Sequence, residues 1–311
     1  MTFFRADAKA TEIGETLVTR ALRQFGPQGL SADRFALTLL LHPEPLDGAT
    51  TEAQPAGYSW NGDQLFYPCS VVKVFYLAAA QQRLEEGFLT PHEDLSRAMR
   101  DMIRVSSNMA TNYVIDLVTE TTGDTVLPPD AMAQWREKRL WVNRFLVGFG
   151  WPEFAGINAC QKLMDDERYG REKAFVGPNG DNHNRLTTEA TARLFHAIMA
   201  GRVVTPERSR AMRDYLVRPL DAQFIRDEPA GQVLGYFAAG LPGDAKAWTK
   251  AGWTGWTGDA AASFRRHDAA HVELANGQRF TLVAFTQGRE ISANMDVLPT
   301  MAAQMTAIVS S

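Results

Sequence analysis

The chain has 311 residues, a formal net charge of −4 at pH 7 and a hydrophobic content of 45%. This length supports one large domain, or two closely packed lobes that share a cleft. The mildly acidic balance and the scattered lysines and arginines argue against nucleic acid as a partner, and no apolar run approaches the ~18 residues that span a bilayer.

The first half of the chain is predicted to be mostly helical. Residues 7–25 have the spacing of an amphipathic helix that docks on a sheet, and apolar strands follow at 34–42 and 57–60. A T-x-x-E pattern at Thr90 and Glu93 predicts a capped helix start. The further helices of this half are predicted at 69–86, 91–104, 108–119 and 130–147.

The second half of the chain is predicted to return to strands after a long irregular segment. Residues 152–186 are charged and contain several glycines, which is typical of a functional or mobile loop. Asn276 and Gly277 predict a hairpin turn before the last strand. The predicted elements are helices at 187–200 and 206–217, strands at about 247–254, 260–266 or slightly beyond, and 279–287, and a C-terminal helix at about 293–308.

One short pattern places a nucleophile beside a base. Ser70 and Lys73 form the only S-x-x-K of the chain, in an apolar stretch that we interpret as a helix opening just after Pro68. Residues three apart on a helix face each other, so the Lys73 amine can take the proton of the Ser70 hydroxyl. The helix N-terminus adds free N–H groups where charge develops on an attacked carbonyl oxygen. Taken alone, the pattern also fits an ordinary buried helix with a solvated lysine.

Two companion patterns follow in order along the chain. An S-x-N at Ser106 and Asn108 lies between two predicted helices, where a serine is also a simple N-cap. Lys250 and Gly252 form the only K-x-G, just before a predicted β-hairpin, where a lysine is often merely solvated.

In this order, the three patterns resemble the signature of class A β-lactamases and penicillin-binding proteins. The helix from Asn108 to Asn112 is similar to the family's N-T-A-A-N helix, and Leu186 to Thr188 is similar to the start of its T-T-P-x-x-M-A segment. The resemblance covers roughly residues 30–310 and implies an α+β fold. The implied fold is an antiparallel sheet of about five strands flanked by helices, with an all-helical lobe and the active site between them. The chain would be a single catalytic domain, 1–311, with an α/β lobe of 1–66 and about 205–311 and a helical lobe of about 67–204.

The resemblance also implies roles for the motif residues. Ser70 attacks a carbonyl and forms an acyl-enzyme, and Lys73 is the base for that attack. Ser106 passes a proton to the leaving group, and Asn108 orients Lys73 and the substrate amide. Lys250 supplies positive charge that keeps Lys73 and Ser106 partly deprotonated.

The end of the third motif is expected to bind the substrate carbonyl. The backbone N–H groups of Ser70 and Trp253 are predicted to form an oxyanion hole, with Gly252 beside them. We expect the Trp253 ring to line the cleft, although core packing of the neighbouring tryptophans fits about as well.

The chain departs from the family pattern in ways that bear on the substrate. Ala251 stands where the family prefers Thr or Ser, whose hydroxyl helps to hold a substrate carboxylate. The stretch after Gly87 is short, so that side of the pocket should be more open. No clear E-x-x-x-N precedes Thr187; of the nearby acids Glu167 and Glu172, the second has the better spacing and is the candidate for water activation.

Other chemistry-bearing residues are interpreted as structural. Cys69 and Cys160 are the only cysteines, and we expect Cys69 to be a buried free thiol. His267 and His271 are four apart, but zinc needs that spacing on a helix and this segment is predicted as strand or loop, so no metal site is expected. The N-terminus has no basic-then-apolar secretion segment, from which we expect a cytoplasmic protein.

The sequence therefore predicts a serine hydrolase that cleaves an amide or ester of a small acyl substrate, without a cofactor, nucleic acid or membrane as partner. Its oligomeric state stays open. Two alternatives remain: a true class A-type β-lactamase, and a non-catalytic or slowly acylated protein of the penicillin-binding kind. Ala251, the missing E-x-x-x-N and the absent secretion segment favour the amidase or esterase over the β-lactamase.

Overall fold

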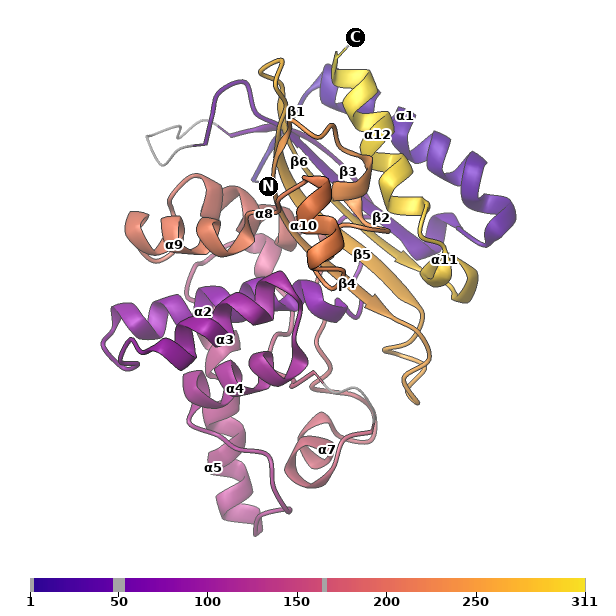
Figure 1. Cartoon of the computed structure of the whole chain (residues 1–311). Helices are drawn as coiled ribbons and strands as arrows, with labels where there is room; N and C mark the ends of the chain where they lie inside the picture. The colour runs from indigo at the N-terminus through magenta and orange to yellow at the C-terminus, as the bar shows by residue number, and fades with distance from the viewer. Residues whose placement is uncertain (1–2, 47–53, 164–166, 311) are drawn as a thin grey trace.

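The computed structural model describes residues 3–46, 54–163 and 167–310 of the chain. Its centre is a six-stranded sheet in the order β1-β3-β2-β6-β5-β4 (Figure 1). β1 pairs parallel with β3, and the other neighbours are antiparallel. The strands are β1 (Arg5–Ala6), β2 (Phe35–Leu41), β3 (Ala56–Trp60), β4 (Lys246–Thr254), β5 (Arg265–Glu273) and β6 (Arg279–Gln287).

The predicted α+β class is confirmed, and two details of the sheet differ from the prediction. The sheet has six strands rather than about five, because β1 is a two-residue edge strand that is too short to show alternation. β5 begins at Arg265 instead of 260, and it is buried along almost its whole length even though it contains His267, Asp268 and His271. Because polar side chains lie on both buried faces of β5, its sequence lacks the apolar pattern from which a buried strand is usually predicted.

Helices cover both faces of the sheet. α1 (Ala8–Phe25) buries one stripe of apolar residues, packs against β2 and β3, and lies beside α12 (Val297–Ser310) on that face (Figure 1). α8 (Thr188–Met199) packs against β2, β5 and β6 on the other face, between the sheet and the remaining helices. The helices predicted at 7–25, at 187–200 and at about 293–308 thus agree with α1, α8 and α12 to within a few residues.

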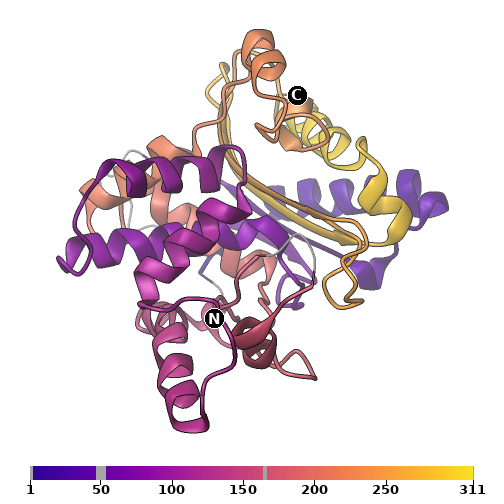
Figure 2. The ribbon, with the colours of Figure 1, turned by 60° about the horizontal axis from the view of Figure 1, so that its bottom comes forward.

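Most of the remaining helices form a second layer, to the left of the sheet in Figure 2. At its centre is α2 (Lys73–Glu85), whose residues 73–81 are all buried, as expected of a helix surrounded by protein. In the same layer lie α3 (Glu93–Arg104), α4 (Asn108–Thr119), α5 (Pro129–Arg139), α6 (Trp141–Val147), α7 (Gly170–Val176) and α9 (Pro206–Leu216). α10 (Ala222–Asp227) and α11 (Arg289–Ala293) lie outside this layer, and α11 contacts β5 and β6 near α12 (Figure 1). No helix among the described residues is long and apolar enough to cross a bilayer.

Several helix boundaries correct the sequence-based expectation. The helix predicted at 130–147 is two helices that meet at Leu140. α3 begins at Glu93 with His92 as its N-cap, not Thr90, and the His92 ring accepts from the Leu95 N–H. α7 interrupts the segment predicted as irregular, and α10 had no clear periodicity to reveal it.

Candidate active site

Ser70 lies on a short 3₁₀ turn, Cys69–Val72, that leads directly into α2. The Lys73 N–H donates to the Ser70 carbonyl, so the serine is one turn before the lysine, as expected, although this first turn is 3₁₀ rather than α-helical. Ser70 faces a small cavity of about 50 Å³. Its lining residues are Tyr67, Cys69, Ser70, Asn108, Leu163, Arg168, Trp253, Thr254, Thr257 and Ala262.

Lys73 is completely buried and reaches the S-x-N motif. Its Nζ donates to the Ser106 carbonyl at 2.5 Å, to the Ser106 hydroxyl at 3.1 Å and to Asn108 Oδ1 at 2.8 Å. The structure therefore brings the first two motifs together around one ammonium group, from positions more than thirty residues apart in the chain.

Ser106 does not cap the helix that follows it, so the alternative N-cap interpretation is wrong. Ser107 is the N-cap of α4, and its side chain accepts from the Ala110 N–H. Ser106 instead adopts a φ of 58°, a left-handed conformation that is uncommon for a residue with a Cβ. Backbone outliers of this kind cluster at functional sites, and this one presents both oxygens of Ser106 to lysine side chains.

Lys250 approaches the same hydroxyl from the sheet. It is completely buried on the edge strand β4, and its Nζ donates to Ser106 Oγ at 3.1 Å, to Gln232 Oε1 at 2.5 Å and to the Ala251 carbonyl at 2.7 Å. Burial and the nearby charge of Lys73 lower the pKa of Lys250 well below its usual range. All three motifs thus meet at Ser106, where two lysines share one hydroxyl.

Gly252 allows β4 to touch the serine turn. A Cβ at this position would lie 2.9 Å from Cys69 Cβ, from the Pro68 carbonyl oxygen and from the Ser70 nitrogen. Real Cβ atoms essentially never come so close to backbone, so only glycine lets the strand lie directly against the turn. The next residue, Trp253, lines the Ser70 cavity while its indole N–H donates to the Ser292 carbonyl at 2.7 Å. The oxyanion hole of the Ser70 and Trp253 N–H groups stays a prediction.

Cys69 is a buried free thiol, as predicted. Burial raises its pKa to about 12, so it is inert as a nucleophile at neutral pH. Ala251, the departure from the family pattern, is completely buried and offers no group to a substrate.

Glu172, the candidate for water activation, lies on α7 in a buried ion-pair cluster. Both of its oxygens accept from the Arg139 guanidinium, at 2.8 and 2.9 Å, and Lys162 Nζ lies 3.7 Å away. Glu172 is not among the described residues that line the Ser70 cavity. This arrangement explains Glu172 as an anchor of α7, and nothing in it directs the carboxylate at Ser70.

His267 and His271 lie on β5, not on a helix, and both rings make structural contacts inside the protein. His267 Nδ1 accepts from the Thr286 N–H at 3.1 Å and its Nε2 contacts the Tyr67 carbonyl at 2.9 Å. His271 Nδ1 lies 3.0 Å from Thr281 Oγ1. Among the described residues, no three His, Cys, Asp or Glu side chains are placed to hold a metal ion.

Two residues at the site had no motif to reveal them. Gln232 accepts from Lys250 out of a loop and itself has a φ of 56°. Arg168 lines the Ser70 cavity from the charged segment that precedes α7. Pro229 and Gly231 before Gln232, and a long charged loop before α7, were the only sequence signals, and neither specifies a contact.

Comparison with known families agrees with this geometry. The model of the β-lactamase enzyme family matches residues 94–309, more than two thirds of the chain, so the chain belongs to that family. This supports a serine hydrolase of the β-lactamase type. The match begins after Ser70 and Lys73, so these two residues rest on the structure rather than on the family match. No curated protein sequence matches the chain significantly.

Solved structures show the same fold over nearly the whole chain. A β-lactamase from Sphaerobacter thermophilus superposes with a TM-score of 0.62 at 16% identity, covering 94% of this chain and 95% of the other. PBP-A gives a TM-score of 0.61 at 17% identity, covering 99% and 98%. A variant of the class A β-lactamase of the last common ancestor of Gram-negative bacteria gives a TM-score of 0.60 at 18% identity, covering 95% and 98%.

Proposed function

We propose that this protein is a serine hydrolase that works through an acyl-enzyme on Ser70 and cleaves an amide or ester of a small acyl substrate. One observation carries the proposal: Lys73 Nζ and Lys250 Nζ both lie 3.1 Å from Ser106 Oγ, next to the serine turn. Two buried lysines around one hydroxyl repel each other, so the arrangement costs stability. A protein that only binds a ligand gains nothing from it. An enzyme that moves protons does need it.

In the proposed acylation, Ser70 Oγ attacks the substrate carbonyl carbon and its proton passes to the neutral amine of Lys73. The oxyanion that forms accepts hydrogen bonds from the N–H groups of Ser70 and Trp253. The proton then passes through Ser106 to the leaving nitrogen or oxygen as its bond to carbon breaks, and an ester of Ser70 remains. Asn108 holds the Lys73 amine in place through the contact at 2.8 Å.

Lys250 tunes this transfer through its charge. Its pKa is lowered first by burial of the amine and then by the charge of Lys73 in the same site. When Lys250 is protonated, its charge favours the loss of a proton from Ser106 and from Lys73. The Gln232 contact keeps its amine aimed at Ser106.

Deacylation needs a water that attacks the Ser70 ester. The position of Glu172 in an ion-pair cluster favours Lys73 or Ser106 as the group that activates this water. A small acyl group leaves room for it in the cavity beside Ser70.

The proposal is tested by intact-protein mass spectrometry after incubation with penicillins, chromogenic esters and a fluorophosphonate. Native protein should gain one acyl or phosphonyl group, and Ser70→Ala should gain none while its circular dichroism spectrum is unchanged. Ser96→Ala, which changes an exposed serine on α3, serves as the matched control and should label fully. Full labelling of Ser70→Ala would mean that another serine is the nucleophile.

A second candidate, reaction with β-lactams, is favoured by the fold that the chain shares with β-lactamases and PBP-A. Because Ala251 offers no hydroxyl for a carboxylate, we expect at most one equivalent of a chromogenic cephalosporin to react in a burst, while a nitrophenyl ester turns over steadily. Fast steady-state cephalosporin hydrolysis that collapses in Glu172→Ala at a temperature where the variant is folded would put the β-lactamase first.

A further inference from the structure

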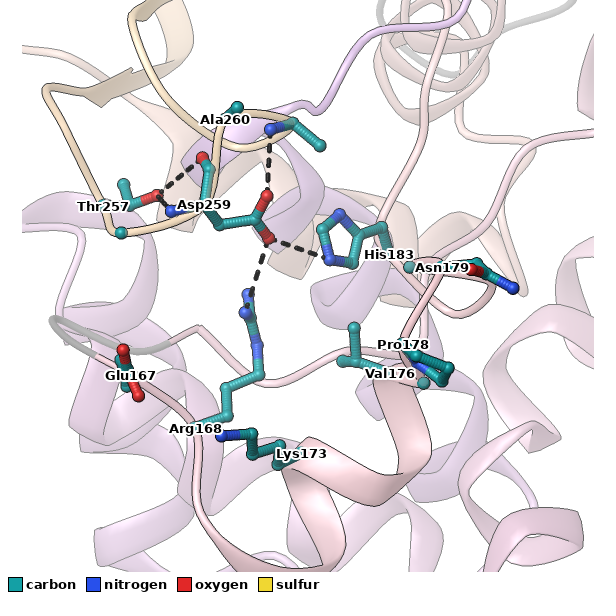
Figure 3. Close-up of a pocket in the computed structure, with 14 residues that line it drawn as sticks. Glu167, Arg168, Lys173, Val176, Pro178, Asn179, His183, Thr257, Asp259 and Ala260 are labelled. Carbon is teal, nitrogen blue, oxygen red and sulfur yellow. Dashed lines mark hydrogen bonds and ion pairs between the residues drawn. The ribbon is translucent and has the colours of Figure 1, made fainter.

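A second, larger cavity of about 460 Å³ adjoins the serine cavity. It opens between the segment around α7 and the loop that joins β4 to β5 (Figure 3). Arg168 and Thr257 line both cavities, so a substrate arm that leaves Ser70 on this side must pass the Arg168 side chain. Charged side chains at the larger cavity come from Glu167, Arg168, Lys173 and Asp259, and His183 lies beside them.

The Arg168 guanidinium is placed at this junction with unused hydrogen-bonding capacity. Its Nε is buried and has no hydrogen-bond partner in the structure. Its Nη1 lies 3.9 Å from Asp259 Oδ2, which is beyond hydrogen-bond distance, and the guanidinium also interacts with the buried Tyr67 hydroxyl. An arginine offers five N–H donors in a planar fork, so a group with two acceptor oxygens fits it well.

Asp259 does not take up that capacity, because other groups satisfy it. Its Oδ2 lies 3.0 Å from His183 Nε2, and its Oδ1 accepts from the Ala261 N–H at 2.9 Å. Burial lowers the pKa of His183, so the neutral ring donates its Nε2 proton to the carboxylate at neutral pH. Figure 3 shows the Asp259 carboxylate between the His183 ring and the Arg168 guanidinium, and the histidine is the nearer of the two.

We propose that Arg168 determines substrate specificity by binding a carboxylate on the acyl arm of the substrate. The inference rests on the proposed function, and it deepens it by naming the substrate class: an amide or ester whose acyl group ends in an anion. In the family pattern a hydroxyl at the position of Ala251 helps to hold a carboxylate, and this chain lacks it. Arg168 lines the serine cavity from the segment before α7.

The charge balance of the larger cavity makes the recognition local. The exposed Lys173 and Glu167 offset each other at the rim, and Asp259 opposes any general attraction of anions. A carboxylate is therefore bound only where it meets the guanidinium fork, so the length of the acyl arm must matter as well as its charge.

The test compares two esters that differ only at the end of the acyl arm, the 4-nitrophenyl monoester of glutaric acid and 4-nitrophenyl valerate. A hydrogen bond to a charged group contributes about 1.5–3 kcal/mol, so kcat/KM of native protein should favour the glutarate ester by about 10–100-fold. Arg168→Gln should lose this preference, so that kcat/KM becomes about equal for the two esters, whereas Arg168→Lys should retain part of it. Arg171→Gln is the matched control, because Arg171 lies on the same segment but donates to the carbonyls of Thr122 and Thr125.

A binding measurement separates failure of this inference from failure of the proposed function. Ser70→Ala protein is titrated calorimetrically with two stable amides, glutaric acid monoanilide and valeranilide, with and without Arg168→Gln. If neither ester is turned over but the monoanilide binds more tightly and only when Arg168 is present, the hydrolase proposal fails and the specificity inference stands. Equal kcat/KM for the two esters, equal slowing of both by Arg168→Gln, or binding of the monoanilide that does not depend on Arg168 would each overturn the inference.

Discussion

The molecule contains two clusters of buried charge, and they are built on opposite rules. In the cluster under α7, the cations Arg139 and Lys162 face the carboxylates of Glu172 and Asp116. At the serine site, two lysines share the hydroxyl of Ser106. The first cluster is balanced and holds elements together. The second brings like charges together and changes how readily they hold a proton.

The difference indicates which buried charges are structural and which are functional. In the balanced cluster, Arg139 donates to both oxygens of Glu172 and to Thr121 Oγ1, and so ties α7 to the helical layer. Such groups are costly to bury unless they are paired and hydrogen-bonded, and here they are. The two lysines do not stabilise the fold in this way, since burial and then the charge of Lys73 lower the pKa of Lys250. Strongly perturbed groups in a cleft are candidates for catalysis.

Replacing Lys73 tests the functional side of this comparison and should have the largest effect. Lys73→Ala should slow the acylation of Ser70 by about 10²–10⁴-fold, because general-base help is lost. Lys73→Arg should be as slow, since a guanidinium does not give up its proton at working pH. The rates are measured as the burst of nitrophenol from a nitrophenyl ester by stopped flow. Normal turnover of the arginine variant would make Lys73 a structural residue like Arg139.

Replacing Glu172 tests the structural side. Glu172→Ala leaves Arg139 buried without its main partner, which typically costs about 3–5 kcal/mol, so the urea midpoint should fall markedly. The acylation rate, measured at a temperature where the variant is folded, should change only a few-fold. Glu167→Ala, at an exposed position, is the matched control and should leave stability nearly unchanged. A normal urea midpoint with lost turnover would move Glu172 from the structural to the catalytic group.

Three buried histidines, His196, His267 and His271, show a third way of burying a titratable group, which is to keep it neutral. Burial lowers the pKa of His267 and His271 to about 3 and that of His196 to about 4, whereas in the unfolded chain they titrate near 6.5. The unfolded state therefore binds protons below pH 6.5 that the folded state does not bind. As the pH is lowered from 6.5 to about 4, the free energy of unfolding should therefore fall by about 1 kcal/mol per pH unit for each of these histidines.

One buried acid works against this trend. Burial raises the pKa of Asp268 from its ordinary 3.8 to about 7, so the folded state binds its proton first, and this stabilises the fold as the pH falls from 7 to 4. The stabilisation from Asp268 cancels about as much free energy of unfolding as one of the histidines removes. Urea unfolding at a series of pH values measures the sum, and His271→Gln should make the slope shallower. A stability that stays flat from pH 7 to pH 5 would contradict the neutral assignment.

The sequence by itself was sufficient where the signal is local. Three features depend on residues within a few positions of each other: the amphipathic spacing of α1, the hairpin turn at Asn276 and Gly277, and the helix α2 that follows Ser70. The order of the three short motifs was enough to identify the family, because each motif lies in the right element. Even the free thiol of Cys69 followed from the lack of a suitable partner.

Only the tertiary structure decided which residues meet. Ser106 acquires Lys250 from a strand 144 positions away, and Glu172 acquires Arg139 from 33 positions away, and no periodicity encodes either partner. The bounds of the strand β5 were predicted wrongly for the same reason, since its polar side chains become acceptable in the core only when distant groups supply hydrogen bonds, as the Tyr67 carbonyl does for His267. Local patterns specify elements because a helix or a strand repeats every few residues. The charge that surrounds a buried group is set by the neighbours that folding brings to it.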